Sequence, residues 1–254
     1  MKSEPAPGLD ERLVVGLQPV REAIRVYGKS LSRVMVDNRK LPRLEALARY
    51  ASDQGVIQVD RVRRGDLDRL ARGASHQGVA CFAPELQLIS LEQVLTPPEQ
   101  LILALDGIQD PQNFGAIIRS AVAIAEAPIL WPESSSAPLT PATFRASAGA
   151  IEHAQLVRVP SLSTALQQAA AADFEVVGLD ANAPKTLREL PLGPKIVLVL
   201  GAEHEGLGKQ VRRACTQTAK LLRPHHIDSL NVSVAAGIAL FQASLARNSA
   251  APAD

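Results

Sequence analysis

Apolar residues in the second half of the chain alternate between short continuous runs and stretches with helical spacing. The continuous runs have the length of strands and lie at residues 101–105, 128–131, 156–159, 175–179 and 196–200. Helical spacing recurs between them, at 116–125, 141–148 and 164–172, with Thr140 and Ser163 as expected helix caps. Continuous apolar runs are typical of strands buried on both faces. We therefore predict an α/β fold, an open parallel sheet with helices on both faces.

The first third of the chain shows a smaller alternating pattern. Strands are predicted at 13–17, 33–36, 56–59 and the apolar end of 76–82, and helices at 18–26 and 41–51. The prolines that follow mark a linker, with a possible short helix at 91–95. The expected organisation is a tail at 1–12, a small α/β domain at 13–83, a linker at 84–100 and a larger domain at 101–248.

Composition and charge narrow the class of protein. A hydrophobic share of 46% in 254 residues suffices for a packed core and excludes disorder for most of the chain. No run approaches the roughly 20 apolar residues of a membrane span, and the start has no apolar signal core, so we expect a soluble, cytoplasmic protein. Two cysteines, Cys81 and Cys215, provide neither a disulfide framework nor a metal set, and we expect no metal site.

The net charge of +1 hides an asymmetry between the two parts. Residues 1–83 hold 15 Lys and Arg against 10 Asp and Glu, which favours an anionic partner for the first part, although ordinary solvated surfaces show the same excess. The arginines of 61–64 fit phosphate contacts and helix-surface charges equally well.

Polar residues follow the first apolar run of the larger domain. The turn Asp110-Pro111-Gln112-Asn113 opens a helix, on which Arg119 lies within about 120° of Asn113. The glycines there do not form the G-x-G-x-x-G spacing of dinucleotide sites. The sequence therefore disfavours a nicotinamide or flavin cofactor.

Two further polar stretches lie nearer the C-terminus. The turn 201–208 follows the last apolar run and contains Glu203 and Glu205 among glycines, which suits an uncharged or positively charged ligand better than a phosphate. The third stretch, 225–241, leads from a polar turn into a helix of small and apolar residues that can lie close to another backbone, capped by Asp228 or Ser229.

These three stretches together resemble the three motifs of the SpoU/TrmH group of SPOUT methyltransferases. Asn113, Gly115 and Arg119 match its N-x-G-x-x-x-R, residues 201–206 match its G-x-E-x-x-G, and residues 229–235 match its third motif. The likeness also includes 147–153, 16–20 and 76–78, and so spans nearly the whole chain.

The resemblance implies an RNA methyltransferase of defined architecture. It implies a C-terminal parallel-sheet domain tied into a deep trefoil knot, which general folding rules would place among the last topologies to propose. It also implies a small ribosomal-protein-like RNA-binding domain before the knotted one. The full layout resembles the bacterial subfamily that methylates a ribose 2′-hydroxyl of guanosine in 23S ribosomal RNA. A homodimer formed through the C-terminal domain and the absence of a membrane partner are implied as well.

S-adenosyl-L-methionine is the cofactor that the resemblance implies. The residues expected to bind it, largely through backbone groups, are Leu179, Asp180, Ala181, Leu200, Gly201, Leu221 and Leu230. The chain departs from its relatives at Leu222, Arg223 and His225, which lie on a cofactor-facing loop. His225 and His226 are expected to be surface or packing histidines.

The catalytic residues implied by the resemblance are Arg119, Asn113, Glu203, Ser229 and Asn231. Because a guanidinium has a pKa above about 12, we interpret Arg119 as a donor that clamps a phosphate and stabilises the developing alkoxide rather than as a base. Asn113 and Glu203 are expected to orient Arg119 or the ribose, with Glu203 in a bidentate pair with the guanidinium. Ser229 and Asn231 are expected to bind substrate at a helix N-terminus.

Other functions remain open from the sequence. They are an RNA-binding homologue without catalysis, a 2′-O-methyltransferase for another ribosomal RNA nucleoside or for tRNA, and, more remotely, a dinucleotide-dependent oxidoreductase. The joint presence of Asn113, Arg119, Glu203 and Asn231 argues against loss of catalysis.

Overall fold

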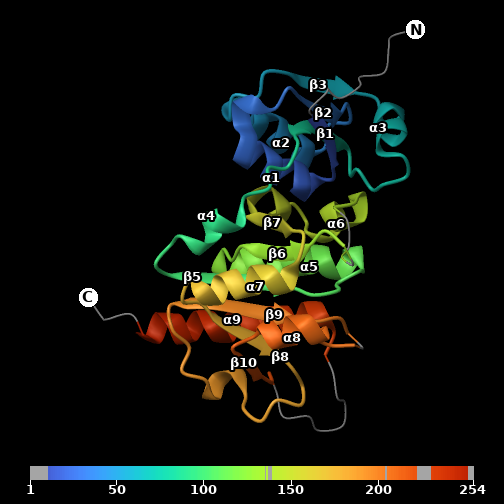
Figure 1. Ribbon diagram of the computed structural model, residues 1–254. Coiled ribbons are helices and arrows are strands. Elements are labelled where there is room, and N and C mark those ends of the chain that lie inside the picture. Colours follow the sequence, from blue (N-terminus) through green and yellow to red (C-terminus); the bar gives the residue numbers. More distant parts are fainter. Residues whose placement is uncertain (1–10, 135, 137–138, 204, 222–229, 251–254) are drawn as a thin grey trace. The chain divides into compact units, whose positions relative to one another are not determined.

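The computed structural model describes residues 11–134, 136, 139–203, 205–221 and 230–250. Its contacts divide the chain into two compact units (Figure 1). Unit 1 contains residues 1–87 and 148–153, and unit 2 contains residues 88–147 and 154–254. Among the described residues, no helix has the length and apolar character needed to cross a membrane.

Unit 1 is a four-stranded mixed sheet with helices. Its strands have the order β1-β4-β2-β3, with β4 antiparallel to β1 and β2, and β3 parallel to β2. The elements are β1 (Glu11–Val15), α1 (Leu17–Tyr27), η1 (Gly28–Ser30), β2 (Arg33–Asp37), α2 (Pro42–Asp53), β3 (Val59–Val62), α3 (Arg64–Ala71) and β4 (Val79–Pro84). Helices α1 and α2 pack their buried residues on β2 and β4, which forms the core of the unit.

Three local features of unit 1 differ from the sequence prediction. Strand β1 begins at Glu11, so the expected tail at 1–12 overlaps the sheet. The strand predicted at 56–59 lies at Val59–Val62 instead, where it forms an edge of the sheet and so carries few buried residues. Helix α3 was not predicted, because only Leu67 and Ala71 of its residues are buried and its apolar pattern is short.

The segment 148–153 belongs to unit 1 although its neighbours in sequence belong to unit 2. Arg12 of β1 forms an ion pair with Glu152, and the two side chains are only 10% and 1% exposed. One hydrogen bond of this pair joins Arg12 Nη1 to Glu152 Oε1 at 3.0 Å. Nearby, His153 Nε2 lies 2.9 Å from Glu22 Oε2 on α1. The chain thus passes between the units three times, after residues 87, 147 and 153.

Unit 2 contains the parallel sheet that the apolar runs predicted. All its strand pairs are parallel, and the strand order is β10-β8-β9-β5-β6-β7. The strands are β5 (Gln100–Leu105), β6 (Ile129–Pro132), β7 (Leu156–Val159), β8 (Glu175–Leu179), β9 (Lys195–Leu200) and β10 (Gln217–Ala219). The five predicted strands are confirmed to within one residue at each end. Strand β10 was missed because it has only three residues, of which only Ala219 is buried.

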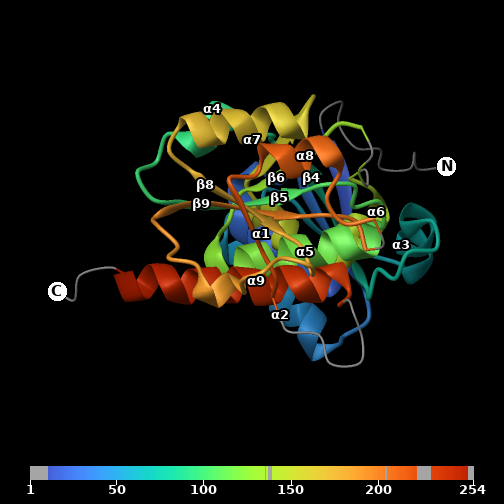
Figure 2. The ribbon, with the colours of Figure 1, turned by 60° about the horizontal axis from the view of Figure 1, so that its bottom comes forward.

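Helices cover both faces of this sheet, as predicted. Figure 2 shows α4, α7 and α8 over one face and α5 and α9 over the other. The helical elements are α4 (Leu91–Leu95), α5 (Pro111–Ala125), α6 (Pro141–Ala146), α7 (Leu162–Ala171), η3 (Leu187–Glu189), α8 (Lys209–Ala214) and α9 (Val232–Ala250), while η2 (Ala150–His153) lies in the segment assigned to unit 1. The small residues of α9 let it pack closely on its neighbours. Three of its alanines are fully buried, namely Ala236, Ala239 and Ala243.

The helix caps agree with the prediction at one place and differ at another. Thr140 caps α6, where its Oγ1 accepts a hydrogen bond from the backbone N–H of Thr143 at 3.4 Å. The predicted cap Ser163 is wrong, since α7 begins at Leu162 and Ser161 accepts from the N–H of Thr164. Helix α8 was not predicted, because its six residues bury only Val211 and Ala214.

The direction of winding changes in the middle of the sheet. From β5 the chain proceeds through β6 to β7 on one side, whereas β8, β9 and β10 lie on the other side of β5. Such a switch leaves room for a ligand outside the carboxyl ends of the two central strands, here β5 and β9. The loops that follow these two strands carry the first two motifs.

Candidate functional site

Side chains from the three motifs meet in one hydrogen-bonded cluster. Asn113 on the first turn of α5 donates through Nδ2 to Glu203 Oε1 at 3.1 Å. Asn231, just before α9, donates to the same oxygen at 2.8 Å and to Asn113 Oδ1 at 2.9 Å. The backbone N–H of Val232 also donates to Glu203 Oε1, at 3.2 Å. The sequence predicted all three residues as site residues, and the structure brings them together.

Asn231 also caps helix α9. Its Oδ1 accepts hydrogen bonds from the backbone N–H groups of Ser233 at 3.0 Å and Val234 at 3.4 Å, and from Ser233 Oγ at 2.6 Å. An asparagine at this position satisfies N–H groups that have no partner within the helix. The side-chain amide of Asn231 already forms hydrogen bonds with Asn113, Glu203 and the first N–H groups of α9. Asn231 therefore fits a positioning role better than the predicted direct contact with substrate.

Two motif glycines are required by close backbone approach. A Cβ on Gly115 would lie 2.5 Å from both Thr143 O and Ala146 Cβ of α6, so only glycine lets α5 pack this tightly on α6. A Cβ on Gly201 would lie 2.1 Å from the carbonyl group of Gly206, because the turn after β9 folds back on itself. The N–H of Gly206 closes that turn on Ala202 O at 2.9 Å. These contacts explain why glycine occurs in both motifs.

Arg119 lies on α5 and is exposed. Within the described part of the chain it forms no hydrogen bond or ion pair. The predicted bidentate pair with Glu203 is therefore wrong for this structure, because the bonds that hold Glu203 Oε1 come from Asn113, Asn231 and Val232. None of the described residues therefore occupies its guanidinium.

The residues predicted to bind the cofactor follow three neighbouring strands. Leu179 ends β8, Leu200 ends β9, and Leu221 comes two residues after β10. The carboxyl ends of β8 and β10 are joined by a hydrogen bond from Asp180 N to Ala219 O at 2.9 Å. Leu230 is 39% exposed, an unusual position for a large apolar side chain. Ser229 and the departures at Leu222, Arg223 and His225 lie outside the described residues, as does His226.

Two polar contacts at these strand ends were not expected from the sequence. Asp106, directly after β5, accepts a hydrogen bond from the N–H of Gly208 at 2.7 Å and so fixes the end of the turn 201–208. Asp180 forms an ion pair with Arg212 of α8. An acid placed directly after a buried strand was the available signal for Asp106. No sequence pattern pointed to Arg212, because helix α8 itself was not predicted.

Models of two families match the chain. The model described as SpoU rRNA Methylase family matches residues 100–241, more than half of the 254 residues. The chain belongs to the SpoU rRNA Methylase family. A second model, described as RNA 2′-O ribose methyltransferase substrate binding, matches residues 13–88. The boundary between the two matches lies close to the one between the two units.

Curated relatives resemble part of the chain. The 23S rRNA (guanosine-2′-O-)-methyltransferase RlmB of Xylella fastidiosa is 37% identical over 145 residues, which cover 57% of this chain and 58% of the relative. An uncharacterized tRNA/rRNA methyltransferase of Mycobacterium avium is 38% identical over 157 residues, 62% of this chain and 51% of the relative. The chain thus spans between half and three fifths of the length of these relatives.

Solved structures resemble nearly the whole chain. The SpoU methyltransferase AviRb of Streptomyces viridochromogenes matches with a TM-score of 0.77 and 23% identity, covering 94% of this chain and 91% of that one. The AdoMet-bound rRNA methyltransferase of Sinorhizobium meliloti matches with a TM-score of 0.75 and 24% identity, covering 96% and 89%. They share the fold of this chain and confirm the predicted fold class, an α/β domain with a parallel sheet preceded by a small α/β domain.

Proposed function

We propose that the protein transfers a methyl group from S-adenosylmethionine to a ribose 2′-hydroxyl of ribosomal RNA. The observation that carries the proposal is the cluster in which Asn113, Glu203 and Asn231 join the three motifs at the carboxyl ends of β5 and β9. The family membership of the chain and its match to an RNA substrate-binding model support the same reaction. The relative from Xylella fastidiosa is named for guanosine in 23S rRNA, and we propose the same nucleoside class here.

The residues at the strand ends fit a cofactor that carries a positive sulfonium. The carboxylates of Asp106 after β5 and Glu203 after β9 have no ion pair among the described residues and favour a cation over a phosphate, whereas Asp180 after β8 is paired with Arg212. The exposed Leu230 offers apolar surface beside them. We propose that Leu179, Asp180, Ala181, Leu200, Gly201, Leu221 and Leu230 hold the cofactor. The chemistry supplied by bound S-adenosylmethionine is an electrophilic methyl group on sulfur.

In the proposed reaction the ribose 2′-oxygen would bond to the methyl carbon as the bond between that carbon and the cofactor sulfur breaks, and the hydroxyl proton would pass to water. The protein contributes mainly by positioning and by stabilising charge. Arg119 is exposed and has no partner among the described residues, so its donors are available to an RNA phosphate and to the developing alkoxide. A guanidinium stays protonated at neutral pH, so Arg119 acts as a clamp rather than as a base.

Glu203 is held so that one oxygen remains available. Its Oε1 accepts three N–H donors, whereas its Oε2 makes no hydrogen bond within the described part of the chain. We propose that Oε2 accepts from the ribose hydroxyl and orients it. Asn113 and Asn231 keep the carboxylate in place, and Ser229, at the start of the third motif, completes the proposed site.

The direct test follows labelled methyl groups from S-adenosylmethionine into ribosomal RNA that lacks the modification. Digestion of the product should yield one 2′-O-methylated nucleoside, and mapping of the site should place it in 23S rRNA. Label in a base, or none in RNA while calorimetry shows cofactor binding, would overturn the proposed reaction. Label at another ribose would change the substrate and leave the reaction class standing.

We further propose that the protein forms a homodimer through unit 2. Val234, Phe241 and Leu245 lie within about 40° of one another around helix α9, and their side chains are 50%, 54% and 50% exposed. A row of large apolar side chains on one helix favours burial against a second copy. Light scattering should give twice the 27.0 kDa mass for the wild type and the single mass for Phe241→Glu. A wild type at the single mass contradicts the dimer.

A further inference from the structure

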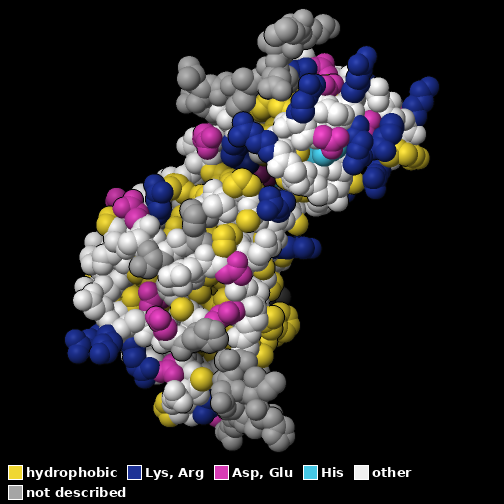
Figure 3. Space-filling view, turned by 90° about the vertical axis from the view of Figure 1, so that its right-hand side faces the viewer, with side chains coloured by type: hydrophobic (Ala, Val, Ile, Leu, Met, Phe, Trp, Pro, Cys, Tyr) yellow, Lys and Arg dark blue, Asp and Glu magenta, His cyan; other side chains and the backbone are white. Residues whose placement is uncertain are grey.

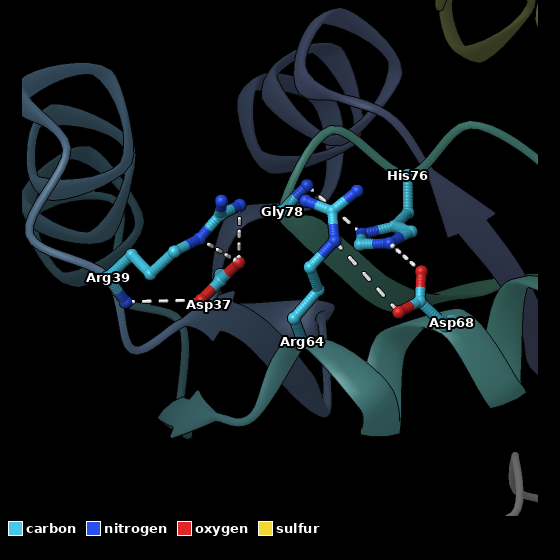
Figure 4. Close-up of polar contacts among 6 residues, drawn as sticks. All are labelled: Asp37, Arg39, Arg64, Asp68, His76 and Gly78. Atoms are coloured by element: carbon cyan, nitrogen blue, oxygen red, sulfur yellow. Dashed lines mark hydrogen bonds and ion pairs between the residues drawn. The ribbon is translucent and has the colours of Figure 1, made fainter.

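A histidine in the core of unit 1 makes one hydrogen bond with each ring nitrogen. His76 is only 3% exposed, and its Nδ1 accepts a hydrogen bond from the backbone N–H of Gly78 at 3.0 Å. Since Nδ1 accepts, the ring proton is on Nε2, which donates to Asp68 Oδ1 of α3 at 2.9 Å. The imidazole therefore ties helix α3 to the turn 76–78 (Figure 4).

A buried carboxylate lies on the other side of the same turn. Asp37, at the end of β2, is fully buried, and its backbone N–H donates to Gly78 O at 2.8 Å. Its Oδ2 accepts from Arg39 Nε at 2.8 Å and pairs with Nη2 at 2.7 Å, while Oδ1 accepts the backbone N–H of Arg39 at 3.1 Å. Burial alone would raise the pKa of Asp37, but these hydrogen bonds, with the charges of Arg39 and Arg64, lower it. Asp37 thus stays ionised and fixes the guanidinium.

Two guanidinium groups are thereby brought to one edge of unit 1. Figure 4 shows Arg64 between the Asp37–Gly78 side and the His76–Asp68 side, beside Arg39. The side chains of Arg39 and Arg64 are 49% and 54% exposed. Arg64 Nε lies 3.9 Å from Asp68 Oδ2, a loose ion pair that leaves its donors available. Arg39 Nη1 has no hydrogen bond among the described residues.

More cations surround this edge. Lys40 and Arg43 are exposed and form no ion pair within the described part of the chain. Figure 3, which looks onto unit 1 from the side of α3, shows Lys and Arg side chains gathered there.

We propose that this edge, where β2 ends and α3 begins, binds the RNA phosphodiester backbone, with Arg39 as a donor that Asp37 orients and Arg64 as a second, exposed donor. The inference rests on the proposed function, since it takes the RNA substrate as the occupant of unit 1. A planar guanidinium held in place, as Asp37 holds that of Arg39, can match phosphate oxygens with parallel N–H donors and loses little rotamer entropy on binding. Double-stranded RNA is recognised mostly by its shape and by contacts to its phosphates and 2′-hydroxyls, which an edge with exposed arginines suits.

The test measures RNA affinity at several salt concentrations. In the double variant Arg39→Gln/Arg64→Gln, affinity for a ribosomal RNA fragment should fall about tenfold or more at low salt, and the slope of log affinity against log salt should fall by about 1.4 to 1.8. Arg21→Gln/Arg49→Gln removes the same charge from exposed positions elsewhere on unit 1 and should leave the slope within about 0.5 of the wild type. Equal losses in both variants, or none in the first, would overturn the proposed edge.

Two further variants separate folding from binding. Arg64→Gln alone breaks only the loose 3.9 Å ion pair, so it should melt like the wild type and still lower the slope by about 0.7 to 0.9. Arg39→Lys keeps the charge but loses the planar fork, and its affinity should lie between those of the wild type and Arg39→Gln. If the wild type binds RNA and methylates it while Arg64→Gln binds equally well, the edge is wrong and the function stands. If the wild type neither binds nor methylates RNA, the proposed function fails.

Discussion

The two units place their polar side chains in opposite ways. In unit 1, Asp37, His76 and Glu152 are buried and each has a charged or hydrogen-bonding partner. In unit 2, Glu203 and Asn231 are exposed beside the strand ends, and Arg119 has no partner among the described residues. Buried and satisfied networks fix shape, whereas exposed groups with unused donors can respond to a ligand. The difference fits our proposals that unit 1 binds RNA and that unit 2 supplies the groups at the reaction.

The largest expected effect concerns the buried pair of unit 1. Glu152→Ala should lower the free energy of unfolding by about 3–5 kcal/mol, because it leaves the charge of Arg12 buried with its partner removed. The measurement is the urea midpoint. Arg12→Met/Glu152→Leu removes both charges and should recover most of the loss. A Glu152→Ala variant as stable as the wild type would mean that the pair does not hold segment 148–153.

Arg119→Ala should lower kcat for methyl transfer by about 100- to 1000-fold, the range for loss of one donor to a developing oxyanion. Calorimetry should show unchanged cofactor affinity. Arg213→Ala serves as the control, since Arg213 is an exposed arginine of α8 on the opposite face of the sheet. Full activity in Arg119→Ala would remove Arg119 from the proposed mechanism.

Gly115→Ala should destabilise the protein by about 1–3 kcal/mol, because the added methyl group has no space between α5 and α6. Activity should fall with it, since α5 carries Asn113. Gly237→Ala provides a matched control on α9, where the nearest atom to the new Cβ is Ser120 Oγ at 3.7 Å. The measurement is the melting temperature of each variant, which should fall for Gly115→Ala and change little for Gly237→Ala. Equal stability would show that the contact with α6 relaxes without cost.

The smallest effect is a dependence of stability on pH. The pKa of Asp37 is lowered in the folded protein, so its stabilising contribution is present above the unfolded-state pKa of about 3.9 and is lost as the pH falls through the folded value. Asp37→Asn should therefore be less stable than the wild type at pH 7, and the difference should shrink towards pH 3. A difference that grows on acidification has the opposite sign and would contradict the lowered pKa.

The sequence predicted the parallel sheet because strands buried on both faces leave long apolar runs. Elements with little burial were misplaced or missed: the edge strand β3 lies three residues later than predicted, and the three-residue β10 and the short helices α3 and α8 were not predicted. The motifs contain the three residues that meet in the cluster, Asn113, Glu203 and Asn231, but they did not predict which of their atoms meet. The spacing of Asn113 and Arg119 gives their directions on one helix, whereas Glu203 reaches that helix from a distant loop. The partner of Glu203 was therefore assigned wrongly.

Our central proposal is that unit 1 binds RNA and unit 2 carries out the chemical step. Steady-state methylation with ribosomal RNA as the varied substrate tests it most directly. We expect Arg39→Gln/Arg64→Gln to raise KM for RNA and leave kcat within about twofold of the wild type, and Arg119→Ala to lower kcat with little change in KM. If the unit 1 variant instead lowers kcat at saturating RNA, or Arg119→Ala raises only KM, binding and chemistry are not divided between the two units in this way.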